Sequence, residues 1–451
     1  MVSTKSSPIV SLQAPKDVSI EEIEAELRSL WTSVEDASAS RAATFTLVVY
    51  EPDGTQQLLA ALGFYTGPID GIAGPRNEAA ITAAQKEYSL EVTGKSSPEL
   101  LTRLQTEYAQ AKAKDQLNSE NQTSAMQYSP DSQGAIADAI ASANPCRIIA
   151  LVPSLGQDEG VQAQVSAYCP VNKKSKDTLI CCEYITLSGT AEALERIGGV
   201  ITELTIGDLP RFLWWKATPR IDHPLFTRLT GYCDSTIIDS SAFNDPESDL
   251  ACIGKMIKQD VPLADLNWRR LGAWQELSAE AFDPPERRSE IYEVDQVTID
   301  YQKGNQTQAL MFLGWLASRL NWTPLEYNHE GGDYDIRRIK FISDRDQRSI
   351  EAELAAIPTA DNQDVPGDLI SLRLTSTNLN ADCCTVLCSS TTGCMRMEAG
   401  GGAQSCYIQQ VAPLFDQKTE ELLGQQLQRW GREVLYEESM AVTAKILELS
   451  H

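Results

Sequence analysis

The chain has 451 residues and a formal net charge of −25 at pH 7, from 63 acidic and 38 basic side chains. Its length predicts two to three domains, and its hydrophobic content of 42% is ordinary for a globular protein. The negative charge argues against nucleic acid and anionic membranes as partners, because both attract Lys and Arg. Two explanations of the charge remain open, namely solubility and a partner with basic patches.

The N-terminal region predicts a helix and no export signal. Residues 18–33 have apolar side chains at helical spacing, with Ser19 as N-cap and Glu22 completing a capping box. Residues 1–18 lack the apolar core of a secretion signal, so we expect a cytoplasmic protein. The longest apolar stretch, residues 309–320, is too short to span a bilayer, which predicts a core helix and no membrane association.

After a predicted strand at residues 44–50, the chain changes character. Residues 56–104 contain the turn LGFYTGPIDGIAGP, whose glycines allow positive φ, and Pro75 can open a following helix. With the later VTGKSSPEL, this segment resembles the peptidoglycan-binding-like domain, which implies a small all-α module. Peptidoglycan lies outside the cytosol, so we favour a docking or spacer role over cell-wall binding, since fold does not fix function.

Beyond a polar linker at residues 108–144, strands and helices alternate and predict an α/β domain with a mainly parallel region. The expected strands are residues 147–152, 161–168, 178–187, 212–216 and 235–239, and the expected helices are residues 191–204, 225–230 and 246–259. The small module is then an insertion after the first strand of this domain, which a surface loop tolerates.

From residue 288 the pattern predicts a separate α+β domain. Its expected strands are residues 291–300, 334–342, 369–374, 382–388, 394–397 and 405–409, and its expected helices are residues 306–320 and 418–430. The predicted organisation is therefore an α/β N-terminal domain with an inserted all-α module and a C-terminal α+β domain. The predicted boundaries are 15–51 with 145–287 for the α/β domain, 52–107 for the module, 108–144 for the linker and 288–451 for the C-terminal domain.

Two of the eleven cysteines, Cys388 and Cys394, flank the turn at residues 389–393 of a predicted hairpin. Residues bordering such a turn lie about 4.5–5.5 Å apart between Cα atoms, within the range of a disulfide. A reversible redox switch is one interpretation. The alternatives are two reduced strand cysteines, or zinc held with Cys383 and Cys384, which the lack of C-x-x-C pairs disfavours. We predict no metal and no cofactor.

Residues 208–288 are rich in tryptophan and arginine but contain no phosphate loop, no metal-ligand spacing and no nucleophile beside a base. Aromatic and arginine anchors without reactive groups are typical of a protein-binding surface. This composition predicts a binding protein and not an enzyme. The candidate contact residues are Trp215, Trp268, Arg269, Arg270 and Trp274, and burial of the tryptophans is the alternative.

Three motifs in the same region are more specific. They are DLP followed by LWW at residues 208–215, DSTIIDSS at residues 234–241, and DLNWRRLGAWQEL at residues 265–277. With PKDVSIEEIEAELRSLW at residues 15–31, they resemble the OpcA family, whose members assemble and activate glucose-6-phosphate dehydrogenase. The resemblance covers most of the chain apart from the inserted module.

The resemblance implies a partner and a regulatory role. Glucose-6-phosphate dehydrogenase is the implied partner, and the implied function is non-catalytic promotion of its assembly and allosteric activation. Redox-linked control, with thioredoxin as a transient partner, is also implied and favours the disulfide interpretation of Cys388 and Cys394. The alternative function, based on the inserted module, is a peptidoglycan-associated binding protein.

Overall fold

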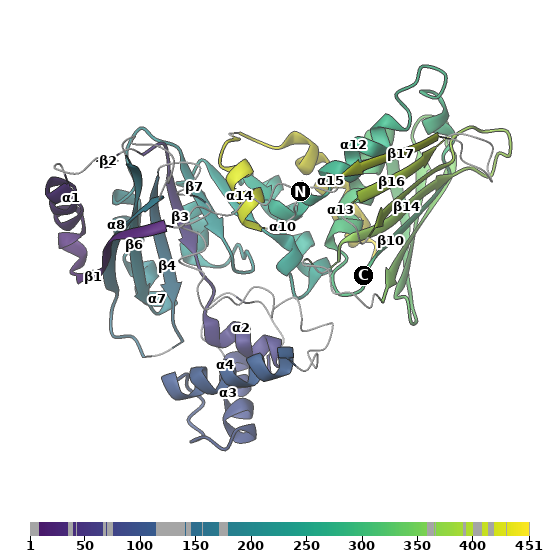
Figure 1. Cartoon of the computed structure of the whole chain (residues 1–451). Helices are drawn as coiled ribbons and strands as arrows, with labels where there is room; N and C mark the ends of the chain where they lie inside the picture. The colour runs from purple at the N-terminus through teal and green to yellow at the C-terminus, as the bar shows by residue number, and fades with distance from the viewer. Residues whose placement is uncertain are drawn as a thin grey trace. The chain divides into compact units, whose positions relative to one another are not determined.

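The structure, a computed structural model, contains two mixed sheets with helices and divides into two compact units (Figure 1). Unit 1 comprises residues 1–238, 261–264 and 419–432, and unit 2 comprises residues 239–260, 265–418 and 433–451. The structure describes the chain except residues 1–8, 35–38, 42, 66–68, 70–74, 114–139, 141–145, 156, 171–178, 359–364, 366, 391–393, 400–407, 414–418, 430 and 451.

The sheet of unit 1 has the order β1-β5-β6-β4-β3-β7-β8-β9, with β2 pairing to β6. Its strands are β1 (Ile9–Val18), β2 (Ala39–Arg41), β3 (Thr46–Tyr50), β4 (Arg147–Pro153), β5 (Gln162–Pro170), β6 (Leu179–Gly189), β7 (Arg211–Trp215), β8 (Ser235–Ile238) and β9 (Leu263–Asp265). Strands β6, β4, β3, β7 and β8 are parallel, as the alternating pattern predicted. The chain builds outward from β3 on both sides, so β3 and β7 form a topological switch point.

Helices of unit 1 follow the predicted positions with three differences. Glu22 accepts hydrogen bonds from the Ser19 N–H and Oγ at 3.4 and 2.9 Å, but the residues after Ser19 form a short 3-10 turn before α1 (Ile23–Val34). The helix expected at residues 191–204 is divided into α7 (Ala191–Arg196) and α8 (Gly198–Glu203), because two glycines open the second piece and glycine propagates a helix poorly. Helix α9 (Pro224–Thr230) begins one residue earlier than expected.

The inserted segment contains α2 (Gly54–Ala61), α3 (Pro75–Glu87) and α4 (Pro98–Ala113), and Pro75 opens α3 as predicted. Its core is formed by Leu58, Leu59, Ala60, Ala61, Tyr65, Ile69, Ala80, Ile81, Ala84, Leu100, Leu104, Tyr108 and Leu155. Helix α4 continues to Ala113, beyond residue 108, where the sequence predicted the linker to begin. The rest of that linker, apart from residue 140, lies outside the described residues.

The sheet of unit 2 has the order β11-β12-β13-β10-β14-β15-β16-β17. Its strands are β10 (Gln296–Gln302), β11 (Trp322–Gly331), β12 (Ile336–Ser343), β13 (Ser349–Ile357), β14 (Leu369–Thr375), β15 (Thr385–Ser390), β16 (Cys394–Ala399) and β17 (Ile408–Pro413). Its helices include α10 (Pro246–Lys258), α11 (Leu266–Arg270), α12 (Gly272–Glu280), α13 (Thr307–Leu320) and α15 (Val434–Glu448), while α14 (Thr419–Gln426) belongs to unit 1.

Strands β1, β2, β9, β11 and β13 and helix α15 were not expected from the sequence. The compact units separate after residue 238, whereas the sequence predicted a boundary after residue 287. Because compact units and domains need not coincide, the predicted domain boundaries stay predictions. No helix in the described parts of the chain has the length and apolarity needed to cross a bilayer.

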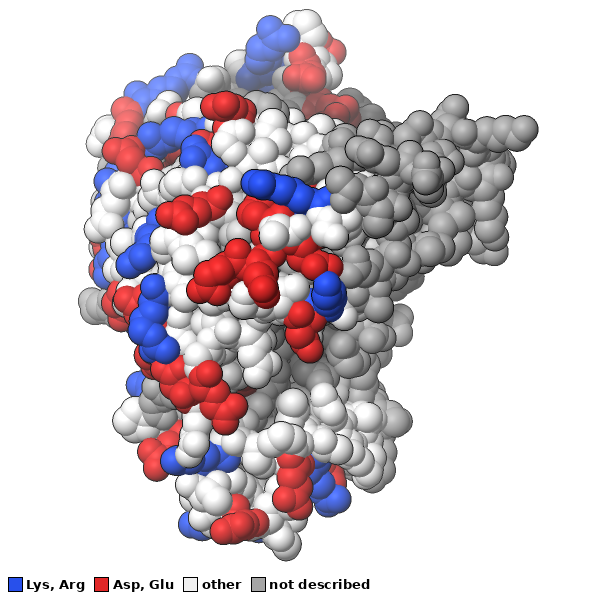
Figure 2. All heavy atoms as spheres, turned by 90° about the vertical axis from the view of Figure 1, so that its left-hand side faces the viewer, with Lys and Arg blue, Asp and Glu red and all other residues white. Residues whose placement is uncertain are grey.

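The negative charge is unevenly distributed on the face drawn in Figure 2. Acidic side chains gather there in several patches, and Lys and Arg side chains lie between them. This arrangement gives the surface both signs of charge, so a partner meets local patterns and not a uniform field.

Candidate functional site

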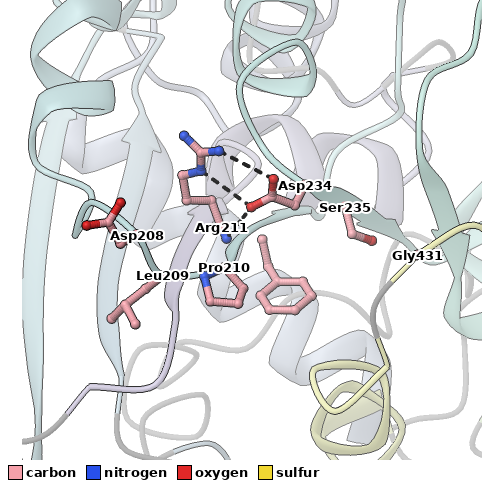
Figure 3. A pocket seen from close by; sticks show the side chains of 8 residues that line it. Asp208, Leu209, Pro210, Arg211, Asp234, Ser235 and Gly431 are labelled. Carbon is pink, nitrogen blue, oxygen red and sulfur yellow. Dashed lines mark hydrogen bonds and ion pairs between the residues drawn. The ribbon is translucent and has the colours of Figure 1, made fainter.

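A cavity of about 540 Å³ opens at the amino ends of β7 and β8 (Figure 3). It is lined by Asp208, Leu209, Pro210, Arg211, Phe212, Asp234, Ser235 and Gly431. Seven of these eight residues belong to the DLP motif and the β7 strand that follows it, or to the DSTIIDSS motif. The cavity therefore brings together motifs that lie more than twenty residues apart in the sequence.

The DLP turn is held in place by the centre of the sheet. Asp208 has a φ of 65°, in the left-handed region that residues other than glycine rarely adopt. The carbonyl of Pro210 accepts a hydrogen bond from the N–H of Thr46, the first residue of β3, at 2.9 Å. Such strain persists where surrounding contacts determine the conformation, and it is frequent at functional sites.

Arg211 and Asp234 join the two motifs. Asp234 Oδ2 accepts from the Arg211 N–H at 2.9 Å, and its Oδ1 accepts from the guanidinium at 3.3 Å. The guanidinium also lies over the ring of Tyr232, with 4.5 Å to the ring centroid. Partial burial raises the pKa of Asp234, but the hydrogen bonds from Arg211 outweigh it and lower the pKa below its usual value. Arg211 is thus held by Asp234 and Tyr232.

The lining of the cavity carries a formal charge of −1, from the carboxylates of Asp208 and Asp234 and the guanidinium of Arg211. Asp208 is exposed, whereas Leu209 and Pro210 are half-buried and Phe212 is buried. An apolar wall beside a solvent-facing carboxylate suits the aliphatic stem and cationic head of a Lys or Arg side chain.

The opposite edge of the same sheet is filled by side chains. In open α/β sheets, ligands ordinarily bind outside the carboxyl ends of the strands at the switch point. Here Tyr50, at the end of β3, stacks on Trp215, at the end of β7, with ring centroids 3.8 Å apart. His223 packs edge-on against both rings at 5.6 and 5.0 Å. These three buried side chains occupy the position where a ligand would approach.

The inserted module also contacts this edge of the sheet. Asp53 caps α2 by accepting from the Gln56 N–H at 3.0 Å, and its second oxygen accepts from the Leu155 N–H at 3.3 Å. Ile69, in the turn of the module, accepts from the Thr218 N–H at 2.9 Å and donates to Thr218 Oγ1 at 3.3 Å. The module is therefore hydrogen-bonded to the α/β sheet through residues that follow β4 and β7.

The predicted contact residues are in the core. Trp215, Trp268, Trp274 and Arg270 are buried, with exposed fractions of 0, 4, 2 and 3%. The guanidinium of Arg269 pairs with Glu433 at 3.2 Å, and its side chain is 7% exposed. The expectation of an exposed tryptophan and arginine surface is therefore wrong. Trp268 and Trp274 are interior because α11 and α12 direct these large apolar rings inward, where burial stabilises them most.

Arg270 belongs to a buried polar cluster of unit 2. It forms two hydrogen bonds with Asp239, at 2.7 and 2.9 Å. The neighbouring Asp265 accepts from the N–H groups of Ser240 and Asn267 at 3.0 and 2.9 Å. Burial, together with the negative charge of Asp239, raises the pKa of Asp265 to about 6. The guanidinium of Arg270 thus pairs with Asp239, whereas Asp265 is held by backbone N–H groups.

The cysteine hairpin differs from the predicted geometry. In the register of β15 and β16, Cys388 lies opposite Arg396, and Cys394 lies opposite Ser390. The two cysteines are therefore diagonal neighbours and not a directly opposed pair, and diagonal positions are about 7–8 Å apart. The difference arises because β15 continues past Cys388 to Ser390, so that Ser390 and not Cys388 lies opposite Cys394. Cys388 is exposed, and the side chain of Cys394 lies outside the described part.

Sequence reasoning missed the cavity, although its signal was present. The DLP and DSTIIDSS motifs were noted for their resemblance, but only strand pairing places Arg211, the first residue of β7, beside Asp234, which directly precedes β8. Among the described residues, no group of three or more His, Cys, Asp or Glu side chains is placed to hold a metal ion.

Comparison with known proteins identifies the class first. Residues 137–255 match the model of the "Glucose-6-phosphate dehydrogenase subunit N-terminal domain", and residues 261–440 match that of the corresponding C-terminal domain. Residues 55–104 match the model of a "Putative peptidoglycan binding domain". The chain is thus built from the domains of a dehydrogenase-associated subunit with an inserted peptidoglycan-binding-like module.

The full-length relatives identify the family. The chain is 58% identical to a "Putative OxPP cycle protein OpcA" of Synechocystis sp., over 100% of this chain and 96% of that protein. It is 59% identical to the protein of the same name from Nostoc punctiforme, over 100% and 97%. The chain belongs to the OpcA family. A solved dehydrogenase from Clostridium difficile, covering 71% of this chain and 95% of its own, has 10% identity and a TM-score of 0.36.

Proposed function

We propose that this protein is a non-catalytic effector that binds oligomeric glucose-6-phosphate dehydrogenase, promotes its assembly and activates it allosterically. Membership of the OpcA family supports the partner. The filling of the switch-point edge by Tyr50, Trp215 and His223 supports a role that does not use this edge for a dinucleotide. The oxidative pentose phosphate pathway in the cytoplasm is the setting we propose.

The observation that carries the proposal is the convergence of two family-like motifs on one cavity. We propose that this cavity receives a Lys or Arg side chain from the dehydrogenase. The charge of −1 on its lining, on a chain with a net charge of −25, supports a cationic occupant. The carboxylate of Asp208 would pair with the cationic head, and Leu209, Pro210 and Phe212 would pack against the stem.

Activation requires that the protein bind the active form of the dehydrogenase more tightly than the inactive form. A coupling free energy of about 1–3 kcal/mol would change the affinity of the dehydrogenase for its sugar phosphate by about 5- to 150-fold. A ligand of equal affinity for both forms would assemble with the enzyme but leave its kinetics unchanged.

We propose in addition that Cys388 and Cys394 give redox-linked control, with oxidation strengthening activation and thioredoxin reducing the pair. The exposure of Cys388 on β15 suits exchange with another protein. Because the two residues are diagonal in the register, closing the bond requires the hairpin to shift locally. A hairpin with two register states can act as a switch element, because each state would present a different surface.

The decisive experiment is titration of purified dehydrogenase with this protein, with the apparent KM for the sugar phosphate as readout. We expect KM to fall and Asp208→Lys to weaken binding at least about tenfold, because it places like charges in contact. Glu203→Lys is the matched control, since Glu203 is an exposed carboxylate of the preceding helix α8 and does not line the cavity. An unchanged KM at saturating protein would contradict the effector role. Equal effects of both variants would remove the cavity from the interface.

A peptidoglycan-associated binding protein remains the second candidate, because the inserted module matches a putative peptidoglycan binding domain. Incubation of the full chain with purified peptidoglycan, followed by sedimentation, separates the candidates. We expect the protein to stay in the supernatant, since the Ile69 turn of the module already bonds to Thr218. Saturable co-sedimentation would favour this second function.

A further inference from the structure

Two cysteines of unit 1 lie side by side in its sheet, at the position where β4 begins beside β6. Cys146 directly precedes β4, and Cys182 lies on β6, the neighbouring parallel strand. Their Sγ atoms are 3.9 Å apart, and the N–H of Cys146 donates to Cys182 Sγ at 3.4 Å. The register of the following residues, Arg147 opposite Glu183, fixes this arrangement.

The spacing of the strands suits a disulfide. Neighbouring strands lie about 4.7–4.9 Å apart, and disulfides join residues whose Cα atoms are about 4.4–6.8 Å apart. Closing the bond therefore needs the two sulfur atoms to approach from 3.9 Å to about 2.05 Å, which side-chain rotation can supply without separating the strands.

Both cysteines are buried, at 1 and 0% exposure. Burial raises the pKa of Cys146, so this thiol is protonated and slow to react in the closed structure. The contacts that close the site involve Arg147, which pairs with Glu183 at 2.7 Å and with Glu24 of α1 at 2.5 Å. Local opening at the amino end of β4, at less than the cost of global unfolding, would expose the pair.

We propose that Cys146 and Cys182 form a reversible disulfide, independent of the hairpin cysteines and of the proposed function. In the first step, one cysteine thiolate attacks a disulfide reagent of the glutathione type and releases one reagent thiol. The second cysteine then attacks the mixed disulfide and releases the other reagent thiol. Two electrons and two protons pass from the pair to the reagent, and one Sγ–Sγ bond forms.

The test uses the full chain carrying Cys181→Ala, so that the adjacent cysteine cannot confuse the assignment. The protein is equilibrated with glutathione disulfide in sub-denaturing urea, alkylated, digested with trypsin and analysed by mass spectrometry. We expect a peptide pair linked through Cys146 and Cys182 that dithiothreitol separates. The bond closes a loop across the sheet, so the midpoint of thermal unfolding should rise by about 5 °C.

Two further variants give the controls. Cys182→Ala should abolish both the linked peptide and the rise in the unfolding midpoint, whereas Cys233→Ala, another buried cysteine of unit 1, should leave both in place. Alkylation of both cysteines without a link would overturn the proposal. So would a glutathione adduct that persists on either residue, or a link from either to a different cysteine.

Discussion

At the scale of single residues, the most consequential arrangement is the buried cluster around Arg270. Its guanidinium is held by Asp239, while Asp265 is surrounded by N–H donors and lies near the hydroxyl of Tyr436 at 3.5 Å. A buried carboxylate without its own cation is costly when ionised. Asp265 is therefore the residue of this cluster whose charge changes most easily.

Asp265→Asn should stabilise the protein above pH 6. The folded-state pKa of about 6 exceeds the usual 3.8, so the folded state binds the proton more tightly and loses stability as pH rises from about 4 through 6. Asparagine keeps an oxygen that accepts from both N–H groups. Because its side chain does not ionise, the variant does not lose stability over this pH range. We expect a gain of about 1–3 kcal/mol in the free energy of unfolding at pH 8 and little gain at pH 4.

Urea denaturation of the full chain at pH 4 and pH 8 measures this difference in the free energy of unfolding. Asp239→Asn is the matched control, because it leaves the buried Arg270 without its paired charge and should destabilise the fold at both pH values. A gain from Asp265→Asn that is the same at pH 4 and pH 8 would show that Asp265 is not the titrating group.

At the scale of elements, helices α13 and α15 depend on a close approach at Gly314. A side chain added there would collide with Thr443 Oγ1 and would lie 2.7 Å from the Ser439 carbonyl, both on α15. In the present packing, Ser439 Oγ donates to the Met311 carbonyl at 2.7 Å and Thr443 Oγ1 to the Leu310 carbonyl at 3.3 Å. The absence of a side chain at Gly314 permits these contacts.

Gly314→Ala should lower the free energy of unfolding by about 1–3 kcal/mol, because a close-packed interface has no space for one more carbon. Gly424→Ala in α14 is the control, since no atom lies within 4 Å of the added carbon and alanine favours the helix. Thermal unfolding of both variants makes the comparison. A destabilisation shared by the two would point to a general effect of substitution and not to the helix contact.

The elements also show what the sequence could and could not indicate. Strands with β-branched runs, such as β3 and β4, were predicted to within two residues. Strand β13 was missed because SIEAELAAI is rich in alanine and glutamate, which favour helices, and the sheet overrides that preference. Strand β1 was missed because Pro15 argues against a strand, but an edge strand with an irregular register there tolerates proline. Helix α15 has helical spacing and was predictable.

For the candidate site, the sequence showed the motifs but did not show that they line one cavity. Asp208 and Asp234 lie on separate segments, and their common cavity depends on the pairing of β7 with β8. The burial of Trp268 and Trp274 likewise depends on which face of each helix packs inward. Pairing and packing involve residues distant in the sequence, so local patterns alone do not specify them.

At the scale of the whole molecule, the net charge of −25 should control association. If the dehydrogenase presents basic side chains, the association rate constant should fall at least about tenfold between 20 and 500 mM NaCl, because salt screens long-range attraction. Stopped-flow mixing measures this rate, and the unfolding midpoint at both salt concentrations controls for stability. A rate that does not change with salt would leave solubility as the role of the charge.

The position of the module constrains any attempt to remove it. Strands β3 and β4 are parallel neighbours, so the chain must travel from the carboxyl end of one to the amino end of the other. Such a crossover takes about a dozen residues or more, usually with a helix. In this chain, residues 51–146 connect β3 to β4, and they include the whole module. A truncated version would therefore need a substitute helix across the sheet, since a short linker would force the two strands apart or reverse one of them.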